Sequence, residues 1–397
     1  MSAIAGLLLG TFSFIFLISL VVVIHELGHY WAGRMCGVHA EAFSMGFGPT
    51  LWSRRDKNGT VWRIAAFPLG GYVKFLGDAG AASEPDADKL AELRERMGPA
   101  ADQCYHFKPI WARSFITAAG PIANFILAIV IFAVLALSIG GPQYQPAVVG
   151  SVAEGSAAEE AGFLEGDEIL AINGSDIHSF QEIITEVIWR PGQEITFDVS
   201  RGEQQVTLFA TPRATEVEDE FGGTRTFGQL GIGNVPQLIR RDEYAISPGG
   251  IVSAIGHGAD RTWDAVSMTG RYVGHIVTGR ASTDLLNGPL GIAEAAGQTA
   301  QRSVEAGRTP LESTLLLFIN LIQLAGYLSV GLGLVNLLPI PILDGGHLVY
   351  YAYEAVARRP LSMKAQAIGF RLGLVFVLMM MLLATWNDIN YKLSQFF

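Results

Sequence analysis

The sequence contains few charged residues for its length, and acidic residues outnumber basic ones. Only 16% of its 397 residues are charged, whereas 50% are hydrophobic. This composition is too apolar for an ordinary soluble domain and predicts a membrane protein. With 27 Lys and Arg against 37 Asp and Glu, the net charge of -10 argues against a nucleic-acid partner.

The N-terminus lacks the features of a cleaved signal peptide. No Lys or Arg precedes Arg34, and no small-residue cleavage site follows the first hydrophobic run. We therefore expect this run to remain as a permanent helix. Crossing a bilayer takes about 20 mostly apolar residues, and four stretches are long enough. We expect transmembrane helices at about 4–33, 115–139, 314–338 and 369–386, the first with its apolar run at about 4–24.

Basic residues are unevenly distributed among the connecting segments. Residues 34–114 carry eleven Lys or Arg, whereas residues 140–313 spread eleven over about twice that length, and more follow the third span. The positive-inside rule then predicts that loops 34–114 and 339–368 are cytoplasmic. Both termini and residues 140–313 are expected on the opposite side.

Cysteine is rare. Cys36 and Cys104 are the only two, and both fall in the segment expected to face the cytoplasm, so we expect no disulfide. Cys36 lies close in sequence to a pair of histidines. It is interpreted either as a buried thiol or as a metal ligand.

Residues 145–214 have the pattern of a small α+β domain. Short β-rich runs (AVVGSV, EILAING, EITFDVS and QVTLFAT) alternate with Gly and Asp turns, and SFQEIITEVI is typical of a helix. The stretch SAAEEAGFLEGDEILAINGSDI resembles the PDZ domains attached to proteases. Such a domain offers a groove beside an edge strand, where the end of a peptide can add as a further strand. The alternative is that it only packs on the membrane part.

The next region, 215–313, has a different sequence pattern. The acidic patch at 216–220 is interpreted as a solvated turn. Apolar residues then recur at helical spacing from Val252 to Val277, with charged residues between them. This pattern predicts an amphipathic helix that lies on the outer membrane surface or against the PDZ domain.

The first span contains ionisable residues that a lipid-spanning helix does not need for its structure. His25-Glu26-Leu27-Gly28-His29 fits H-E-x-x-H, in which the two histidines stand one turn apart on one helix face and can bind the same zinc ion. Glu26 is then placed to act on a water as general base. Ionisable groups at membrane depth cost roughly 2.5 to 3.5 kcal/mol each on insertion scales. The alternative is a helix end where polar residues meet water.

Two histidines leave a catalytic zinc short of a protein ligand, because such sites usually have three. The candidate is Asp344, in the segment 331–354, where Pro339 and Pro341 break the third span and Gly345-Gly346 follow. An aspartate on a broken helix can direct its carboxylate back into the bundle. Its other interpretation is a turn former.

HELGH in the first span, NLLPIPILDGG after the third and a PDZ domain between them resemble the site-2 intramembrane metalloproteases, and in detail the bacterial regulator-of-sigma-E proteases. The resemblance covers essentially the whole chain and includes FGPTLWSRRDKNGTVWRIAAFPLGGYVKFLGD, HFKPIWARSFITAAGPIANFILAI and NGPLGIAEAAGQTA. One departure is that the best-known members have two tandem PDZ domains, whereas only one is legible here.

The resemblance implies the fold class: an α-helical polytopic membrane protein with four transmembrane helices, a membrane-associated β-hairpin or sheet and an inserted α+β PDZ domain. It implies a Zn²⁺ cofactor held by His25, His29 and Asp344, with Glu26 as the base. It also implies a bacterial inner-membrane location and a substrate that is a single-span membrane protein of the anti-sigma-factor type, or a remnant signal peptide.

Further residues are expected to hold the substrate. Lys57-Asn58-Gly59 between two β-rich runs predicts a hairpin, and 68–75 continues as a possible strand, whose edge could pair with an unwound substrate. Asn124, in the second span, either takes part in the site or bonds a neighbouring helix. The resemblance implies a substrate-binding role for Asn336, Pro339, Pro341 and Asn124, and the predicted strand adds Gly70, Gly71 and Tyr72 as candidates.

Two other functional classes remain open from sequence. Ionisable residues in spans also mark ion pathways, so a zinc transporter or metal-handling protein is one alternative. It would not need a PDZ domain, and the four spans show no inverted repeat. The other is an inactive scaffold that holds membrane partners through the PDZ domain.

Overall fold

The computed structural model of the chain describes most of the sequence and divides it into two compact units. The first unit contains the long apolar helices, and the second contains the small α+β domain. The first unit comprises Met1–Leu135, Gly249–Val266 and Asn287–Thr385. The second unit comprises Ala136–Pro248, Ser267–Leu286 and Trp386–Phe397. The described residues are 3–78, 94–95, 98–139, 147–177, 179–202, 204–218, 224–234, 250–277 and 288–394.

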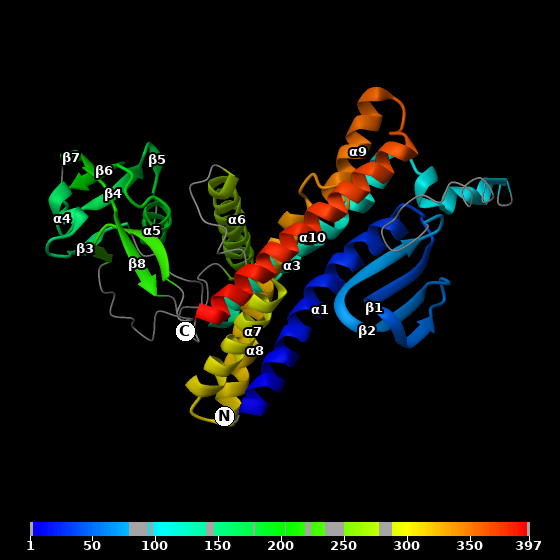
Figure 1. The fold of residues 1–397 in the computed structure, drawn as a ribbon, viewed down its shortest axis with the longest axis horizontal. Coiled ribbons are helices and arrows are strands. Elements are labelled where there is room, and N and C mark those ends of the chain that lie inside the picture. The colour runs from blue at the N-terminus through cyan, green and yellow to red at the C-terminus, as the bar shows by residue number, and fades with distance from the viewer. Residues whose placement is uncertain are drawn as a thin grey trace. The chain divides into compact units, whose positions relative to one another are not determined.

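Among the described residues, four helices are long and apolar enough to cross a membrane (Figure 1). A helix is the expected form for such segments, because it satisfies every interior backbone N–H and C=O within the segment itself. The four helices are α1 (Ala3–Met35), α3 (Ile110–Ile139), α8 (Pro310–Asn336) and α10 (Met363–Ser394).

Small residues allow the helices of the first unit to approach closely. A Cβ atom at Gly28 of α1 would overlap the backbone of Ala119 in α3, and one at Gly333 of α8 would press on Phe125 of α3. Such glycines are typical of membrane helix interfaces, where packing is the main source of association. The contacts bring α1, α3 and α8 together around the candidate site.

Helix α7 (Pro289–Ala306) belongs to this first unit. Its buried residues are Ala296, Ala300 and Ser303, and it packs against α1 and α8. The sequence predicts that this segment belongs to an extracytoplasmic amphipathic region. The hydropathy of the segment did not reveal this packing, because its buried residues are small rather than strongly apolar.

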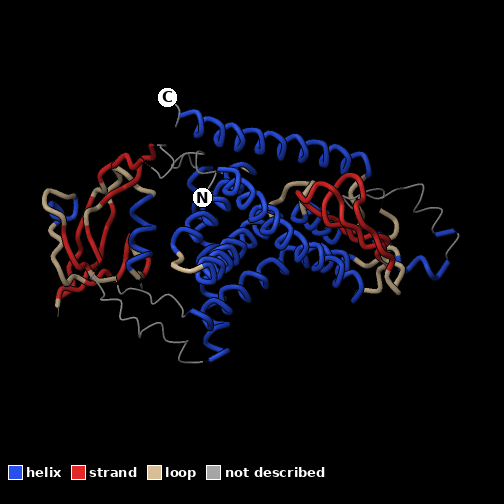
Figure 2. Tube along the Cα trace, turned by 90° about the horizontal axis from the view of Figure 1, so that it is seen from below, coloured by secondary structure: helices blue, strands red, loops and turns tan. Residues whose placement is uncertain are grey.

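Strands β1 (Ala40–Arg55) and β2 (Val61–Phe75) form the predicted antiparallel hairpin beside α1. The carboxylate of Asp56 closes the turn by accepting hydrogen bonds from the backbone N–H groups of Asn58 and Thr60, at 2.8 and 3.0 Å. Both strands bend, so Phe43 of β1 pairs with Trp62 on one side and Val73 on the other. Figure 2 shows this curled arrangement.

The bending gives the sheet an edge on the side of α1. Among the described residues, 71–75 pair only with the start of β1, so no other strand lies along this stretch of β2. That edge lies next to the H-E-x-x-H turn of α1, where a Cβ atom at Gly71 would be 3.1 Å from Cγ1 of Val22. An edge strand is therefore available at the candidate site.

The second unit contains the PDZ-like domain. Its main sheet has the order β5-β4-β6-β7, formed by Ser175–Asp176, Glu168–Ile172, Ile195–Arg201 and Gln204–Ala210. Strand β3 (Val149–Val152), the short helix α4 (Ala157–Ala161) and helix α5 (Phe180–Ile188) complete the core with buried Ile169, Phe197 and Val199. The predicted fold class, a polytopic α-helical membrane protein with a β-sheet and an inserted PDZ domain, is confirmed.

The structure contains strands after residue 212 that the sequence pattern does not predict. β8 (Arg213–Glu218) pairs with β9 (Thr224–Gln229), and β10 (Ile232–Asn234) pairs with β3, so sheet pairing continues past the expected boundary at 214. Glu216 and Glu218 lie in β8 rather than in a turn. The pairing partner of β10 lies some 80 residues earlier, which explains why local pattern did not reveal it. Helix α6 (Gly250–Val277) then follows.

A buried carboxylate anchors the PDZ-like domain. Both guanidinium contacts from Arg201 to Asp167 are 2.8 Å, and the backbone N–H of Leu164 donates to the same carboxylate at 2.8 Å. Burial acts to raise the pKa of Asp167, but these hydrogen bonds outweigh it and hold that pKa below its ordinary value. The stabilisation is therefore complete above the ordinary carboxyl pKa and is lost as the pH falls through the lower folded-state pKa.

Replacing Arg201 with Met is expected to lower the free energy of unfolding of this domain by about 1.5 to 3 kcal/mol, because Asp167 loses its charged donors. Hydrogen exchange of the β4 and β6 amides in the full-length protein measures the change. Arg213→Met is the matched control, because Arg213 pairs with Glu160 on the surface, where the two side chains are 53% and 68% exposed. Equal protection in both variants would contradict the prediction.

Candidate active site

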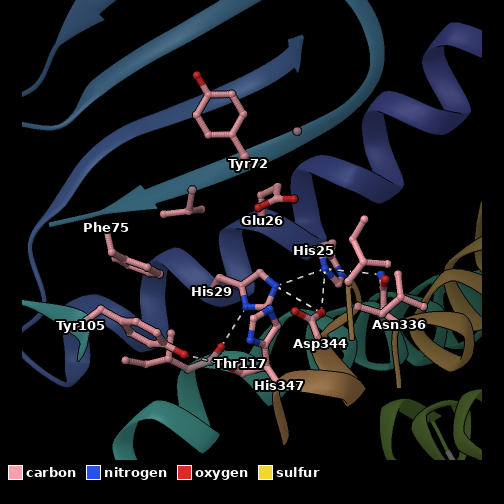
Figure 3. A pocket seen from close by; sticks show the side chains of 15 residues that line it. His25, Glu26, His29, Tyr72, Phe75, Tyr105, Thr117, Asn336, Asp344 and His347 are labelled. Carbon is pink, nitrogen blue, oxygen red and sulfur yellow. Dashed lines mark hydrogen bonds and ion pairs between the residues drawn. The ribbon is translucent and has the colours of Figure 1, made fainter. Parts of the chain in front are cut away.

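Two histidines of α1 and one aspartate of α9 (Asp344–Ala357) converge in the first unit (Figure 3). The Nε2 atoms of His25 and His29 are 3.2 Å apart. Oδ2 of Asp344 lies 3.3 Å from Nε2 of His25 and 3.5 Å from Nε2 of His29. Among the described residues, this is the one group of three or more His, Cys, Asp or Glu side chains with metal-ligand spacing.

Local sequence explains how each side chain reaches this point. His25 and His29 are four residues apart on one helix and so share a face. Helix α8 ends at Asn336, and α9 begins at Asp344, after a loop that folds back tightly. Cβ atoms at Gly345 and Gly346 would overlap the carbonyls of Leu337 and Ile340, so only glycine fits there. The D-G-G sequence thereby places the Asp344 carboxylate against α1.

The geometry of the three donor atoms fits zinc. Zinc holds nitrogen and oxygen ligands at about 2.0–2.2 Å in a tetrahedron, which separates the ligand atoms by roughly 3.3 Å. The observed separations are 3.2, 3.3 and 3.5 Å. Oδ2 of Asp344 is buried and has no hydrogen-bond partner, as expected for an atom that a cation satisfies. Two imidazoles and one carboxylate are also a common ligand set for catalytic zinc.

A hydrogen bond to α3 orients one of the imidazoles. Nδ1 of His29 donates to the backbone carbonyl of Ile116 at 2.9 Å. Because a neutral imidazole carries one N–H, this bond leaves the lone pair of Nε2 directed at His25 and Asp344. The ring is therefore held in the tautomer that can bind a metal.

Glu26 lies beside this cluster, at a cavity of about 190 Å³. Its carboxylate accepts a hydrogen bond from the backbone N–H of Val73 in the β2 edge, and a Cβ atom at Gly71 would be 3.1 Å from its Cγ atom. Figure 3 shows Glu26 between the edge strand and the donor cluster. A carboxylate, a three-donor cluster and an unpaired strand edge thus meet at one cavity.

Comparison with known proteins identifies the family. The sequence profile of peptidase family M50 matches residues 13–380. This chain belongs to peptidase family M50. Over 397 residues it is 45% identical to metalloprotease MmpA of Caulobacter vibrioides, covering 98% of each chain. It is 31% identical over 442 residues to zinc metalloprotease RasP of Bacillus licheniformis, covering 95% of this chain and 98% of RasP.

Among solved structures, the chain is similar to the PDZ domain of an SdrC-like protein from Listeria monocytogenes. That similarity covers 23% of this chain and 90% of the other, with 23% identity and a TM-score of 0.19. The family membership confirms the resemblance to site-2 proteases. The chain is a zinc metalloprotease of the membrane, which resolves the sequence alternatives of a transporter and an inactive scaffold.

The predicted site residues of this M50 peptidase divide into those that line the cavity and those that do not. Asn336, Gly71 and Tyr72 line it, together with His25, Glu26, His29 and Asp344. Nδ2 of Asn336 is 3.5 Å from Nε2 of His25. The cavity lining does not include Gly70, Pro339, Pro341 and Asn124. Cys36 is not part of the donor cluster in the described region.

Several residues at the site were not identified from sequence. Gly120 of α3 lies so close to the two imidazoles that a Cβ atom there would overlap the His29 ring. Its signal in the sequence was GPIAN, a glycine four residues before Asn124. His347 lines the cavity one turn after Asp344, and Thr117 and Tyr105 line it nearby. The Tyr105 hydroxyl is 2.8 Å from Thr117 Oγ1 and 2.7 Å from the Tyr351 hydroxyl.

The segment that carries Asp344 is also fixed further along α9. Arg113 of α3 forms two hydrogen bonds to the carboxylate of Glu354, at 3.1 and 2.7 Å, and its guanidinium lies 4.9 Å from the centre of the Tyr351 ring. A bidentate pair of this kind gives directional as well as electrostatic stabilisation. The position of α9, and with it Asp344, is therefore defined at both ends of the helix.

Proposed function

We propose that this metalloprotease hydrolyses a peptide bond within the transmembrane segment of a single-span substrate. The observation that carries the proposal is that two members of the cluster, His25 and His29, lie on α1, a helix that is itself apolar enough to span a membrane. The reacting centre is then at the depth of the substrate's own span. An ionisable cluster at that depth is retained for function because its insertion is costly.

His25, His29 and Asp344 hold the zinc, and Glu26 is the general base. When bound, the zinc supplies Lewis acidity, which polarises the scissile carbonyl and lowers the pKa of a water. Glu26 takes a proton from the attacking water and returns it to the leaving amine. No residue of the chain forms a covalent bond with the substrate in this mechanism.

The β2 edge supports an extended substrate at this centre. A transmembrane helix hides its amides in its own hydrogen bonds, so a protease must first unwind it. No described strand covers the outer side of residues 71–75, so an unwound segment can add there as a strand, through backbone groups other than the N–H groups that Glu26 and Asp78 accept. We infer that Gly70, Gly71 and Tyr72 bind the substrate there, with Asn336, Pro339 and Pro341 on the other side.

The PDZ-like domain has a groove suited to a peptide end. A cavity of about 530 Å³ lies between α5 and residues 227–232, and its lining is mainly apolar, including Ile183, Val187 and Ile232. β10 pairs only with β3 among the described residues, so it presents an edge toward this groove. We infer that the end of a previously trimmed membrane protein binds there. Substrates of the anti-sigma-factor type and remnant signal peptides have this form.

The proposed location is the bacterial inner membrane. The basic loops 34–114 and 339–368 face the cytoplasm, and the PDZ-like domain and both termini face the other side. H-E-x-x-H then lies in the cytoplasmic half of α1. Cleavage is expected in the corresponding half of the substrate span.

A purified protease and a tagged single-span substrate in detergent test this function. Mass spectrometry of the products is expected to place the cut inside the apolar segment, and a zinc chelator should stop the reaction. Introducing a Gly-Pro pair beside the cut should speed cleavage, because it destabilises the substrate helix by about 3 kcal/mol or more. Cuts confined to the flanking soluble segments, or indifference to the Gly-Pro pair, would overturn the proposal.

A further inference from the structure

We propose that Asn124 is a positioning residue that orients His25 for metal binding, by accepting a hydrogen bond from its Nδ1–H through Oδ1. The inference rests on the proposed role of His25 as a zinc ligand. It replaces the expectation that Asn124 contacts the substrate. No part of Asn124 lines the catalytic cavity, and its side chain is fully buried.

The contact between the two side chains is direct. The amide of Asn124, on α3, meets the imidazole of His25, on α1, with Nδ2 3.2 Å from Nδ1. The other polar atom of the amide, Oδ1, is buried and has no hydrogen-bond partner. A buried acceptor without a partner costs about 1–3 kcal/mol, so a native structure normally supplies a reason for it.

The tautomer of His25 decides which polar atom of the amide faces the ring. With the amide nitrogen toward Nδ1, that ring atom must accept, and the single ring proton then sits on Nε2, pointing at His29 and Asp344. A metal ligand needs the opposite arrangement, with the lone pair on Nε2 and the proton on Nδ1. Rotating the amide by 180° places Oδ1 where it accepts that proton, with almost no change in shape. Metal binding therefore selects the amide orientation in which Oδ1 faces His25.

Helix α3 then orients both histidines in the same way. His29 donates from Nδ1 to the carbonyl of Ile116, 2.9 Å away. With the amide rotated, His25 donates from Nδ1 to Oδ1 of Asn124. The two acceptors differ in one respect. The acceptor for His29 is a backbone atom present whatever the residue, whereas the acceptor for His25 depends on one side chain. Substituting Asn124 therefore affects one ligand of the proposed site without altering any of the three donors.

Two substitutions distinguish the proposed role of Asn124 as a hydrogen-bond acceptor from a role as a donor and from a role in packing alone. Asn124→Leu keeps the size but removes the acceptor, and zinc affinity is expected to fall by about 10- to 100-fold, the range typical of lost outer partners. Asn124→Asp keeps an acceptor in the same place and is expected to retain affinity close to wild type. Ser329→Ala is the packing control, because Ser329 donates only to the backbone carbonyl of Asn124, at 2.8 Å.

Zinc affinity is measured on the full-length protein in detergent by competition with a chromophoric chelator, and the cobalt-substituted protein is compared by visible absorption. Wild-type affinity in folded Asn124→Leu would overturn the inference. If Asn124→Leu does not fold, the Asp variant decides, because its failure to bind zinc would mean that the amide acts as a donor. His25→Ala tests the proposed site separately: if it binds zinc as wild type does, the assignment of His25 itself has failed.

Discussion

Glu26→Gln is expected to slow peptide-bond hydrolysis strongly while zinc stays bound. The substitution preserves the size of the side chain beside Gly71 and the donor cluster, but an amide cannot take a proton from the attacking water. General-base catalysis typically contributes about 10²- to 10⁴-fold, and the cleavage rate should fall by that amount. His25, His29 and Asp344 are unchanged, so the zinc content should be unchanged as well.

The measurement combines the initial cleavage rate of a single-span substrate with zinc content by elemental analysis. Glu41→Gln is the matched control, because Glu41 is a partly exposed carboxylate of the β1 strand, 3.4 Å from Lys74. It should retain wild-type activity. Cleavage at the wild-type rate by a zinc-loaded Glu26→Gln protein would show that another group is the base.

Gly120→Ala is expected to disrupt the zinc site although residue 120 contributes no ligand. A Cβ atom at this position of α3 would overlap Nε2 and Cε1 of His29 and approach Cε1 of His25. The neighbouring atoms are two imidazoles in a packed helix interface, which cannot move aside without separating the donors. Overpacking costs about 1–3 kcal/mol, which corresponds to roughly 5- to 150-fold weaker zinc binding.

The control for this substitution is Gly331→Ala in α8. Gly331 has no atom within 4 Å of its would-be Cβ, and alanine is the better helix former. Chelator competition should therefore show wild-type zinc affinity for Gly331→Ala and weakened affinity for Gly120→Ala. Equal affinities would mean that α3 moves freely relative to α1, contrary to the close packing of Gly28 against Ala119.

The sequence pattern predicted correctly those elements of structure that depend on interactions between residues close together in the chain. The i, i+4 spacing of His25 and His29 follows from helix geometry alone, and the Asn-Gly turn specified the β1–β2 hairpin. Long apolar runs predicted the four helices that are long enough to span, because the bilayer imposes that length. The strands and helix of the PDZ-like domain up to residue 210 also follow from short-range alternation.

The interpretations that changed involve contacts between distant parts of the chain. β10 pairs with β3 some 80 residues away, and α7 packs on α1 through small residues, so neither has a strong local signal. The acidic patch at 216–220 was expected to form a turn, but Glu216 and Glu218 lie in β8, which pairs with β9, and residues 219–220 lie outside the described residues. From sequence, Asn124 was interpreted either as a site residue or as a contact between helices. In the structure its amide lies 3.2 Å from Nδ1 of His25.

The sequence alone predicted the chemical groups of the proposed site and placed the two histidines and Glu26 in a helix apolar enough to span a membrane. The H-E-x-x-H motif in an apolar run supplies two imidazoles and a carboxylate, and the helical period brings the imidazoles to one face. Only the tertiary structure decided that Asp344 lies 3.3 and 3.5 Å from them, that Gly120 leaves the space they occupy, and that Asn124 and Ile116 lie behind them. The reason is physical: separations of a few ångströms across three helices depend on how the side chains of all three pack together, which no local pattern encodes.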